Sequence, residues 1–348
     1  MSAPTLWQAD SHPVSGRDKP IPLISVVVPC YNEAESIRET NRRLLEALEG
    51  QPFAFEIVYV NDGSQDSTFA LLAEFQADDP RVLVIDLSRN FGHQVATTAG
   101  INHSSGDAVV LIDADLQDPP ELIPEMVRHW SKDSDVVYGV RVERAGESAF
   151  KLWTAKAFYR VINRLSSVAI PVDTGDFRLM DRSVVAVLRA MPERDRFLRG
   201  MVSWVGFRQI GIPYRRAARF GGVTKYPLIK MVRFAADGIL SFSVVPLKVA
   251  MFLGFVSSAI ALMGAVLALF FRLFTRSWVP GWTSILLAVL FLGGAQLVCI
   301  GIIGEYLGRV YGEVKHRPLY VVRQRLGCSE RNLTFAASQS DASIKEEK

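Results

Sequence analysis

The residues best suited to chemistry form an acidic stretch in the middle of the chain, residues 113–118 (Asp-Ala-Asp-Leu-Gln-Asp). This stretch directly follows an apolar run at 108–112 that has the length and composition of a buried strand. Two carboxylates separated by one residue at a strand end can converge on one divalent cation, and hard oxygen ligands suit Mg²⁺ or Mn²⁺. A cation there could neutralise charge that grows on a diphosphate leaving group. Because Asp-x-Asp also occurs in solvated turns, it is the position after a strand that favours a metal site.

Asp118, the last carboxylate of the stretch, also has a structural interpretation. It precedes Pro119, Pro120 and Glu121, and an Asp just before a proline is typical of a helix N-cap. We therefore expect Asp118 to cap a helix.

An alternation of apolar runs and helix-like segments between residues 23 and 140 would position the acidic stretch. Strands are expected at 24–28, 56–60, 82–85, 108–112 and 135–139, and helices at 33–48 and 66–75. This order predicts an α/β fold with a mostly parallel, doubly wound sheet. Ligands of such folds bind at the carboxyl ends of the strands. The polar residues expected at those ends are Tyr31, Asn32, Glu33, Asp62, Arg89, Asn90, Asp113 and Asp115.

Apolar residues concentrate near the C-terminus. No charged residue occurs at 249–271 or at 277–304, and each gap exceeds the roughly 20 residues of a bilayer-crossing helix. We expect two transmembrane helices, at about 249–271 and 283–304. Most Lys and Arg residues around this hairpin lie outside its connecting loop, so the positive-inside rule places both termini and the α/β domain in the cytoplasm of an integral inner-membrane protein. The alternative is a pair of buried helices in a soluble protein, which would seldom stay uncharged for so long.

The expected organisation has five parts. Residues 1–22 form a flexible polar tail, 23–225 the α/β domain, 226–243 an amphipathic helix beside the membrane, 244–310 the two transmembrane helices, and 311–348 a cytoplasmic segment that is disordered at its end. Residues 150–165 are a second candidate for an interfacial amphipathic helix.

Composition narrows the function classes. The formal net charge of +3 argues against a nucleic-acid binder that works through a general basic field. The three cysteines, Cys30, Cys299 and Cys328, are odd in number and far apart, so they predict neither a disulfide framework nor a metal-ligand set. No Gly-x-Gly-x-x-Gly follows the first expected strand, which argues against a dinucleotide-dependent oxidoreductase.

Six motifs in order, followed by the hairpin, carry a resemblance to a known family. They are residues 28–33 (VPCYNE), 60–64 (VNDGS), 88–92 (SRNFG), 113–120 (DADLQDPP), 175–179 (GDFRL) and 222–227 (GVTKYP). The chain resembles the family-2 glycosyltransferases of the Rossmann-like GT-A fold, specifically the polyprenyl- or dolichyl-phosphate sugar synthases. Within those, it is similar to the bacterial bactoprenol glucosyltransferase branch with two transmembrane helices. One departure is Thr224, where Ser is expected, but the hydroxyl is kept.

The resemblance implies a role for each matched residue. The nucleotide-sugar would be bound by Pro29, Tyr31, Asn32, Glu33, Asp62, Ser64, Asp113 and Arg141. Asp115 and Gln117, together with Asp113, would hold Mg²⁺ or Mn²⁺. The acceptor phosphate would be bound by Arg178, Arg215, Arg219 and Lys225. Asp113, Asp115 and Asp176 would be the catalytic carboxylates, with Asp176 either orienting or deprotonating the acceptor, or else only pairing with Arg178.

The resemblance also implies the reaction. A hexose, in the first place glucose from UDP-glucose, would pass with inversion to an undecaprenyl-type polyprenyl phosphate at the cytoplasmic membrane face. Mannose, N-acetylhexosamine and amino-arabinose donors stay open, as does a non-catalytic membrane scaffold that binds sugars. A processive polysaccharide synthase is disfavoured because no Gln-x-x-Arg-Trp motif occurs. A homo-oligomer is left open by the small pair Gly304 and Gly308, which could pack helices within the hairpin or between subunits.

Overall fold

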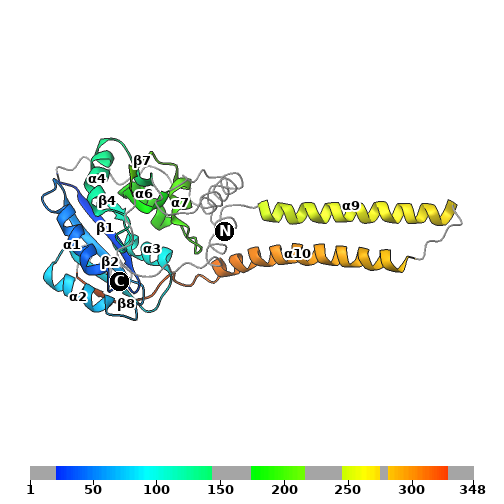
Figure 1. Cartoon of the computed structure of the whole chain (residues 1–348), viewed down its shortest axis with the longest axis horizontal. Coiled ribbons are helices and arrows are strands. Elements are labelled where there is room, and N and C mark those ends of the chain that lie inside the picture. The colour runs from blue at the N-terminus through cyan, green and yellow to red at the C-terminus, as the bar shows by residue number, and fades with distance from the viewer. Residues whose placement is uncertain (1–20, 143–173, 216–244, 275–280, 328–348) are drawn as a thin grey trace, which may run out of the picture. The chain divides into compact units, whose positions relative to one another are not determined.

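The computed structural model describes residues 21–142, 174–215, 245–274 and 281–327 (Figure 1). The chain divides into two compact units: an α/β domain, which includes the described residues up to 215 and those from Pro318 onward, and a helical hairpin. Several expectations lie outside the described residues, namely the tail up to residue 20, the amphipathic helices at 150–165 and 226–243, Arg219, Lys225 and the segment from residue 328.

In the described part of the α/β domain, eight strands form one sheet. They are β1 (Leu23–Cys30), β2 (Ala54–Asn61), β3 (Val82–Leu87), β4 (Ala108–Leu111), β5 (Val136–Arg141), β6 (Thr174–Asp181), β7 (Gln209–Tyr214) and β8 (Val322–Leu326). Their order across the sheet is β7-β5-β6-β4-β1-β2-β3-β8. Within this sheet β6 runs antiparallel to β4 and β5, β8 runs antiparallel to β3, and the other neighbours are parallel. The expected α/β fold with a mostly parallel sheet is confirmed.

Helices connect the strands and cover the sheet (Figure 1). They are α1 (Ile37–Leu48), α2 (Thr68–Asp78), α3 (His93–His103), the short 3₁₀ helix η3 (Pro120–Leu122), α4 (Ile123–Lys132), α6 (Arg182–Ala190) and α7 (Leu198–Val205). Helix α1 begins at Ile37, four residues later than the apolar pattern predicts. The reason is that residues 31–36 form a loop whose backbone bonds to the segment after β2. The Asn32 amide donates to Oγ of Ser64 at 3.0 Å, and the Glu33 amide donates to Oγ1 of Thr68, the first residue of α2, at 2.9 Å.

The central strand β1 shows why the sheet is continuous and apolar. Val26, Val27 and Val28 have no exposed surface, because helices cover both faces of the strand. Val26 and Val28 pack in the cluster that includes α1. On the other face α3 approaches closely, since a Cβ at Gly100 would lie 2.2 Å from Cγ1 of Val27. A side chain at Gly100 would therefore push α3, and the residues at its start, away from the sheet.

Strands β6 and β8 carry too many polar residues to be recognised from apolar periodicity, and β7 (QIGIPY) is interrupted by Gly211 and Pro213. β6 (TGDFRLMD) nevertheless lies between β4 and β5 and is anchored at its end by Asp181. The Asp181 carboxylate accepts from the Ser183 amide at 2.8 Å, as the cap of α6, and from Nε1 of Trp130 on α4 at 2.8 Å. Because Trp130 is fully buried, this pairing joins α4, β6 and α6 in one core.

Strand β8 comes from the segment that the sequence indicates to be a separate cytoplasmic tail. Seven residues, 315–321, connect it to the last helix of the hairpin, and it then closes one edge of the sheet beside β3. The α/β domain therefore includes chain from both sides of the hairpin. The polar sequence of β8 (VRQRL) suits an edge strand, where most side chains face water.

The second unit consists of α9 (Val245–Phe274) and α10 (Trp282–Val314), which pack against each other. Both helices are longer than the expected apolar spans. Windows at Leu247–Gly264 and Phe291–Val314 are long and apolar enough to cross a membrane, and only 6% and 0% of their residues are buried. A Cβ at Gly304 or Gly308 would meet no atom within 4 Å, so neither glycine mediates the contact with α9.

Candidate active site

The polar residues gather at one edge of the sheet because of strand direction. Strands β1 to β5 all point their carboxyl ends to this edge, so the residues that follow them lie there together. Strand β6 is antiparallel and begins at the same edge. Its pairing of Arg178 with Leu111, carried two residues further, places Asp176 opposite Asp113. Residues 63 positions apart in sequence are thus brought together by one antiparallel register.

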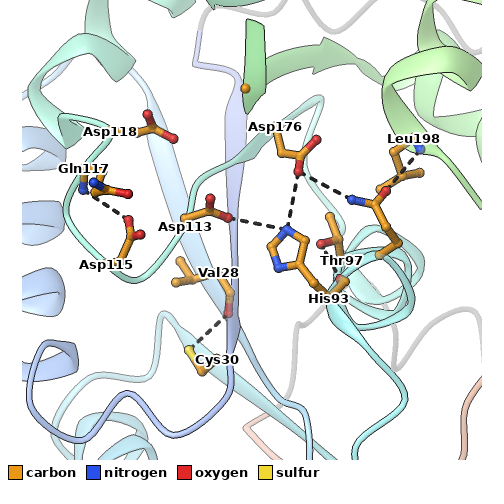
Figure 2. Close-up of polar contacts among 12 residues, drawn as sticks. Val28, Cys30, His93, Thr97, Asp113, Asp115, Gln117, Asp118, Asp176 and Leu198 are labelled. Atoms are coloured by element: carbon orange, nitrogen blue, oxygen red, sulfur yellow. Dashed lines mark hydrogen bonds and ion pairs between the residues drawn. The ribbon is translucent and has the colours of Figure 1, made fainter. Parts of the chain in front are cut away.

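His93, the first residue of α3, lies between these two carboxylates (Figure 2). Its Nε2 atom is 3.5 Å from Oδ1 of Asp113 and 3.5 Å from Oδ2 of Asp176. The sequence indicated no role for His93, because no partner stands at ligand spacing from it. The close approach of α3 to β1 at Gly100 is what brings the imidazole to the acidic edge.

Asp176 has two further partners that the sequence did not reveal. Arg199 on α7 contacts both carboxylate oxygens, with Nε to Oδ1 at 2.7 Å and Nη2 to Oδ2 at 3.2 Å. Gln94 donates from Nε2 to Oδ2 at 3.4 Å, and its Oε1 accepts from the Leu198 amide at 3.1 Å. The start of α7 is therefore tied to Asp176 directly, through Arg199, and indirectly, through Gln94.

The alternative in which Asp176 only pairs with Arg178 does not hold in the described residues, where the ion pairs of Asp176 are with Arg199 and His93. Arg178 is only 4% exposed, and its Nη2 donates to the carbonyl of Gly175 at 3.0 Å. Burial lowers the pKa of Arg178 to about 10, although Asp176 opposes this shift. In the described structure Arg178 thus braces the start of its own strand.

Charge at the site is balanced between carboxylates and cations. Burial, with added repulsion from Asp176, Asp118 and Asp115, raises the pKa of Asp113 to about 6, while His93 opposes the shift. Burial would disfavour a charged imidazole, but Asp113 and Asp176 outweigh it and raise the pKa of His93 to about 9. Burial would likewise raise the pKa of Asp176, yet Arg199 and His93 hold it well below its usual value. At neutral pH the His93 imidazole and the Arg199 guanidinium are therefore both charged and stand among several carboxylates.

The acidic loop after β4 has a backbone shaped by one unusual residue. Leu116 has a φ of 59°, a left-handed conformation that costs a non-glycine residue about 1–2 kcal/mol. Its side chain is 2% exposed, so burial anchors the turn. The turn places Asp115 beside Gln117, and the backbone amide of Gln117 donates to Oδ1 of Asp115 at 3.1 Å. Asp113 points toward His93 instead (Figure 2). Strain of this kind is typical of functional loops.

The donor set of this loop fits a hard divalent cation. Asp113, Asp115 and Gln117 offer carboxylate and amide oxygens, which Mg²⁺ and Mn²⁺ prefer. The repulsion that raises the pKa of Asp113 is the kind that a bound cation relieves. Among the described residues, no three His, Cys, Asp or Glu side chains form a ready metal cluster, so a metal here would need oxygen atoms from other groups as well.

Asp118 does not cap a helix as expected. The N-cap of η3 is Pro119, and no side-chain cap is made. Asp118 is instead turned inward, is 1% exposed and accepts a hydrogen bond from the Tyr214 hydroxyl. Arg141 donates from Nε to the same hydroxyl at 3.1 Å, and its Nη2 lies 3.7 Å from Oδ1 of Asp118. Arg141 is thus held at the edge by β7 and the acidic loop together, through a tyrosine that the sequence did not single out.

The loops after β1 and β2 interlock, and they contain the residues expected to bind the nucleotide. Asn32 has a φ of 54°, a conformation that Asn tolerates. Its amide donates to Oγ of Ser64 at 3.0 Å, and its Oδ1 accepts from the Gln65 amide at 2.8 Å. Glu33 accepts from Oγ of Ser36 at 2.9 Å, and Tyr31 is 37% exposed at the end of β1. Pro29 pairs in register with Val60, inside the sheet.

Asp62 joins these loops to a third one. Asp62 is 2% exposed, and its carboxylate accepts hydrogen bonds from the backbone amides of Phe91 at 2.7 Å and Gly92 at 2.9 Å. Gly63 makes the close approach possible, because a Cβ at this position would lie 2.4 Å from the carbonyl carbon of Arg89. The loops after β1, β2 and β3 therefore form one hydrogen-bonded surface.

Two groups near the site bear less directly on it. Arg215, expected at the acceptor phosphate, is exposed just after β7. Cys30 is buried and donates to the carbonyl of Val28 at 3.4 Å (Figure 2). Burial raises the pKa of its thiol well above the usual value, so Cys30 stays protonated and is a poor nucleophile.

The packing at Gly63 can be tested against a matched glycine. Gly63 and Gly50 both have positive φ values, 65° and 71°, but only Gly63 packs against another backbone. We expect Gly50→Ala to cost about 1–2 kcal/mol through backbone strain alone. Gly63→Ala should cost roughly 1–3 kcal/mol more, because the added methyl overlaps the loop after β3. Thermal unfolding of the detergent-solubilised protein measures the difference. Equal midpoints for the two variants would contradict the close packing.

Comparison with known proteins agrees with this geometry. The profile described as "Glycosyl transferase family 2" matches residues 25–189. The chain is 47% identical to the uncharacterized glycosyltransferase YkcC of Bacillus subtilis, over 89% of this chain and 96% of that protein. It is 42% identical to the bactoprenol glucosyl transferase of Shigella phage SfV, over 86% of this chain and 98% of that protein. The prophage bactoprenol glucosyl transferase homolog of Escherichia coli is 39% identical, with coverages of 86% and 98%.

The profile covers the acidic loop, and the three relatives match 86–89% of the chain, which is too much to leave out the hairpin. With a mostly parallel sheet whose carboxyl edge carries the acidic residues, they show that the chain is a glycosyltransferase of family 2 with the GT-A fold.

Proposed function

We propose that this glycosyltransferase moves glucose from UDP-glucose to a polyprenyl phosphate, with inversion at the sugar carbon, at the cytoplasmic face of the inner membrane. The observation that carries the proposal is the likeness to bactoprenol glucosyl transferases, at 39–42% identity. It covers 86–87% of this chain and 97–99% of those proteins, which is too much of the chain to leave out the hairpin. A shared soluble domain would support sugar transfer alone. A match that includes the hairpin also supports a lipid acceptor.

The hairpin suits a lipid acceptor for a physical reason. A polyprenyl phosphate keeps its chain in the bilayer and its head group at the interface, so the enzyme has to work at the membrane surface. Helices α9 and α10 are apolar, and their candidate spans are almost entirely unburied within the chain, which is costly in water and favourable in lipid. Lysines and arginines around the hairpin favour a cytoplasmic α/β domain and cytoplasmic termini.

The interlocked loops after β1, β2 and β3 are the proposed nucleotide site. They present Tyr31, Asn32, Glu33, Asp62 and Ser64 in a surface that is hydrogen-bonded before any ligand arrives. Such preorganisation lowers the entropy lost when a ligand binds. Arg141, held by Tyr214 and Asp118, adds a positive charge toward the donor diphosphate.

Asp113, Asp115 and Gln117 are the proposed holders of Mg²⁺ or Mn²⁺. When bound, such a cation supplies positive charge to the diphosphate leaving group. The protein residues around the loop contribute orientation: buried Leu116 fixes the turn, and His93 holds the carboxylate of Asp113.

The acceptor phosphate needs no strong base. A phosphomonoester has a second pKa of about 6 and is mostly dianionic at neutral pH. The ion pair with Arg199 holds the pKa of Asp176 well below its usual value, which makes this carboxylate a poor proton acceptor. We therefore assign Asp176 an orienting role, in which it fixes Arg199 and Gln94 at the edge where the phosphate has to approach. Arg178, Arg215, Arg219 and Lys225 stay the proposed basic residues of the acceptor side.

The reaction itself is tested by lipid extraction. Membranes that contain the protein are incubated with a panel of radiolabelled UDP-glucose, GDP-mannose and UDP-N-acetylhexosamines together with a short polyprenyl phosphate. We expect label in the organic phase with UDP-glucose. Label in the organic phase with another donor instead would mean that the transferred sugar is not glucose. No label with any donor would favour a sugar-binding scaffold without catalysis.

The metal site is tested at Asp115. Asp115→Asn should lower sugar transfer by about a hundredfold or more, because a bound cation contributes several kcal/mol of charge stabilisation. The protein should still fold and sediment with membranes. Asp133→Asn is the matched control, since Asp133 is an exposed surface carboxylate paired with Arg208. Full transfer by Asp115→Asn, or by the unaltered protein in excess EDTA, would remove the metal from the mechanism.

The orienting role of Asp176 is tested through its partner. Arg199→Ala should lower kcat about tenfold or more, since small misplacements of site residues are costly. Arg199→Lys should recover only part of this loss, because lysine keeps the charge without the two-pronged contact. Arg208→Ala, which breaks an exposed ion pair, is the control. Steady-state kinetics with unchanged kcat in Arg199→Ala would show that Asp176 needs no such partner.

A further inference from the structure

Strand β8 carries an arginine that the proposed chemistry does not use. In the pairing of β8 with β3, Asp86 lies opposite Gln324 and Leu87 lies opposite Val322. One step along β3 therefore matches two steps along β8, and Arg323 is the extra residue at this bulge. Bulges redirect side chains, and they often lie beside functional sites.

Arg323 contacts the end of β3 in two ways. Its Nη2 donates to the carbonyl of Ser88 at 2.7 Å, and its Nη1 lies 3.5 Å from Oδ2 of Asp86. The backbone adds a third contact, because the Ser88 amide donates to the carbonyl of Val321 at 2.9 Å. Both the amide and the carbonyl of Ser88 are therefore bonded to the chain that follows the hairpin.

Ser88 is the first residue of the loop at 88–92, and the far end of this loop contacts Asp62. At the far end of this loop, the amides of Phe91 and Gly92 donate to the Asp62 carboxylate. Between the two ends, Arg89 lies 4.0 Å over the ring of Phe91. The loop at 88–92 is thus held at one end by β8 and at the other by a residue of the proposed nucleotide site.

A second path leads from Arg323 through buried groups. Asp86 is 2% exposed, and its Oδ1 accepts from Nδ2 of Asn61 at 2.7 Å. Oδ1 of Asn61 in turn accepts from the amide of Ser64 at 3.3 Å. A buried carboxylate needs compensating charge or hydrogen bonds, and Arg323 is the cation at its other oxygen. Both paths end on the loop of Asp62 and Ser64.

We propose that Arg323 is a positioning residue for the nucleotide site, which makes the strand after the hairpin a working part of donor binding. The inference rests on the proposed function, because it assumes that the loops after β1, β2 and β3 bind the donor nucleotide. Arg323 itself does not touch the donor. It fixes Ser88 and Asp86, and through them the loop after β3 and the loop after β2 that carries Asp62 and Ser64.

Arg325 provides a matched control on the same strand. It lies opposite Ile85 and carries the same charge, but within the described part of the chain its guanidinium makes neither of the contacts that Arg323 makes, with the Ser88 carbonyl and with Asp86. Arg325→Ala therefore removes a β8 arginine without disturbing either path. Arg323→Lys keeps a positive charge near Asp86 but lacks the second guanidinium nitrogen that donates to the Ser88 carbonyl.

Kinetics of the full-length protein in membranes test the proposal, with UDP-glucose as donor and a short polyprenyl phosphate as acceptor. Arg323→Ala should raise KM for UDP-glucose about tenfold, equivalent to ~1.4 kcal/mol, while kcat stays within about twofold because the catalytic carboxylates are untouched. Arg323→Lys should recover part of the loss, and Arg325→Ala should match the unaltered protein. An unchanged KM in Arg323→Ala, or an equal rise in Arg325→Ala, would overturn the proposal.

Hydrogen exchange separates this inference from the proposed reaction. Peptides that contain residues 88–92 should exchange several-fold faster in Arg323→Ala than in Arg325→Ala, because the loop loses the hydrogen bond from Arg323 that holds its Ser88 end. Equal protection in the two variants would overturn the positioning role whatever the donor is. If the unaltered protein transfers no glucose, the proposed function fails, while the exchange comparison still decides whether Arg323 orders the loop.

Discussion

The structure of this glycosyltransferase depends on holding several carboxylates together at one edge of a sheet. Asp113, Asp115, Asp118 and Asp176 lie close enough for their charges to repel, and burial makes that repulsion stronger. In the described structure His93 bridges Asp113 and Asp176, and Arg199 also pairs with Asp176. Tyr214 and Arg141 hold Asp118, and the backbone amide of Gln117 donates to Asp115. The same crowding that is costly in the protein alone is what would attract a divalent cation.

The sheet topology is what allows this crowding. Parallel strands deliver the loops after β1 to β5 to one edge, and one antiparallel strand, β6, delivers its beginning to the same edge. The helices then add the cations. Helix α3 approaches β1 at Gly100 and brings His93, while α7 brings Arg199 and is tied back to α3 through Gln94. Acidic residues thus come mainly from strand ends, and their partners come mainly from helix starts.

Strand β8 extends this arrangement to the chain beyond the hairpin. Its pairing with β3 replaces an apolar edge strand by a polar one, which is less prone to associate with other chains. Its arginine at the bulge reaches the loop next to the nucleotide site. The hairpin is therefore an insertion within the α/β domain in chain order, and the domain is complete only when the chain has passed through both apolar helices and returned.

Much of the architecture could be read from the sequence, because its physical causes are local. Strands β1 to β5 are apolar runs, since a buried parallel strand has no polar face, and the residues that follow them had to share one edge. The two apolar helices follow equally from uninterrupted hydrophobic length. Ordered motifs indicated the family and the carboxylates of Asp113, Asp115 and Asp176 before any contact was known.

The partners of those carboxylates could not be read in the same way. His93, Arg199, Tyr214 and Arg323 are separated from their partners by 20 to more than 200 residues, and single polar side chains leave no periodic pattern. Asp118 resembled a helix cap because an Asp before Pro usually caps a helix. Its carboxylate instead binds the hydroxyl of Tyr214, a distant residue that sequence spacing does not reveal. Local chemistry determined which residues lie at the edge of the sheet. Strand register and helix approach decided which of them touch, because those contacts depend on packing between segments that are far apart in the chain.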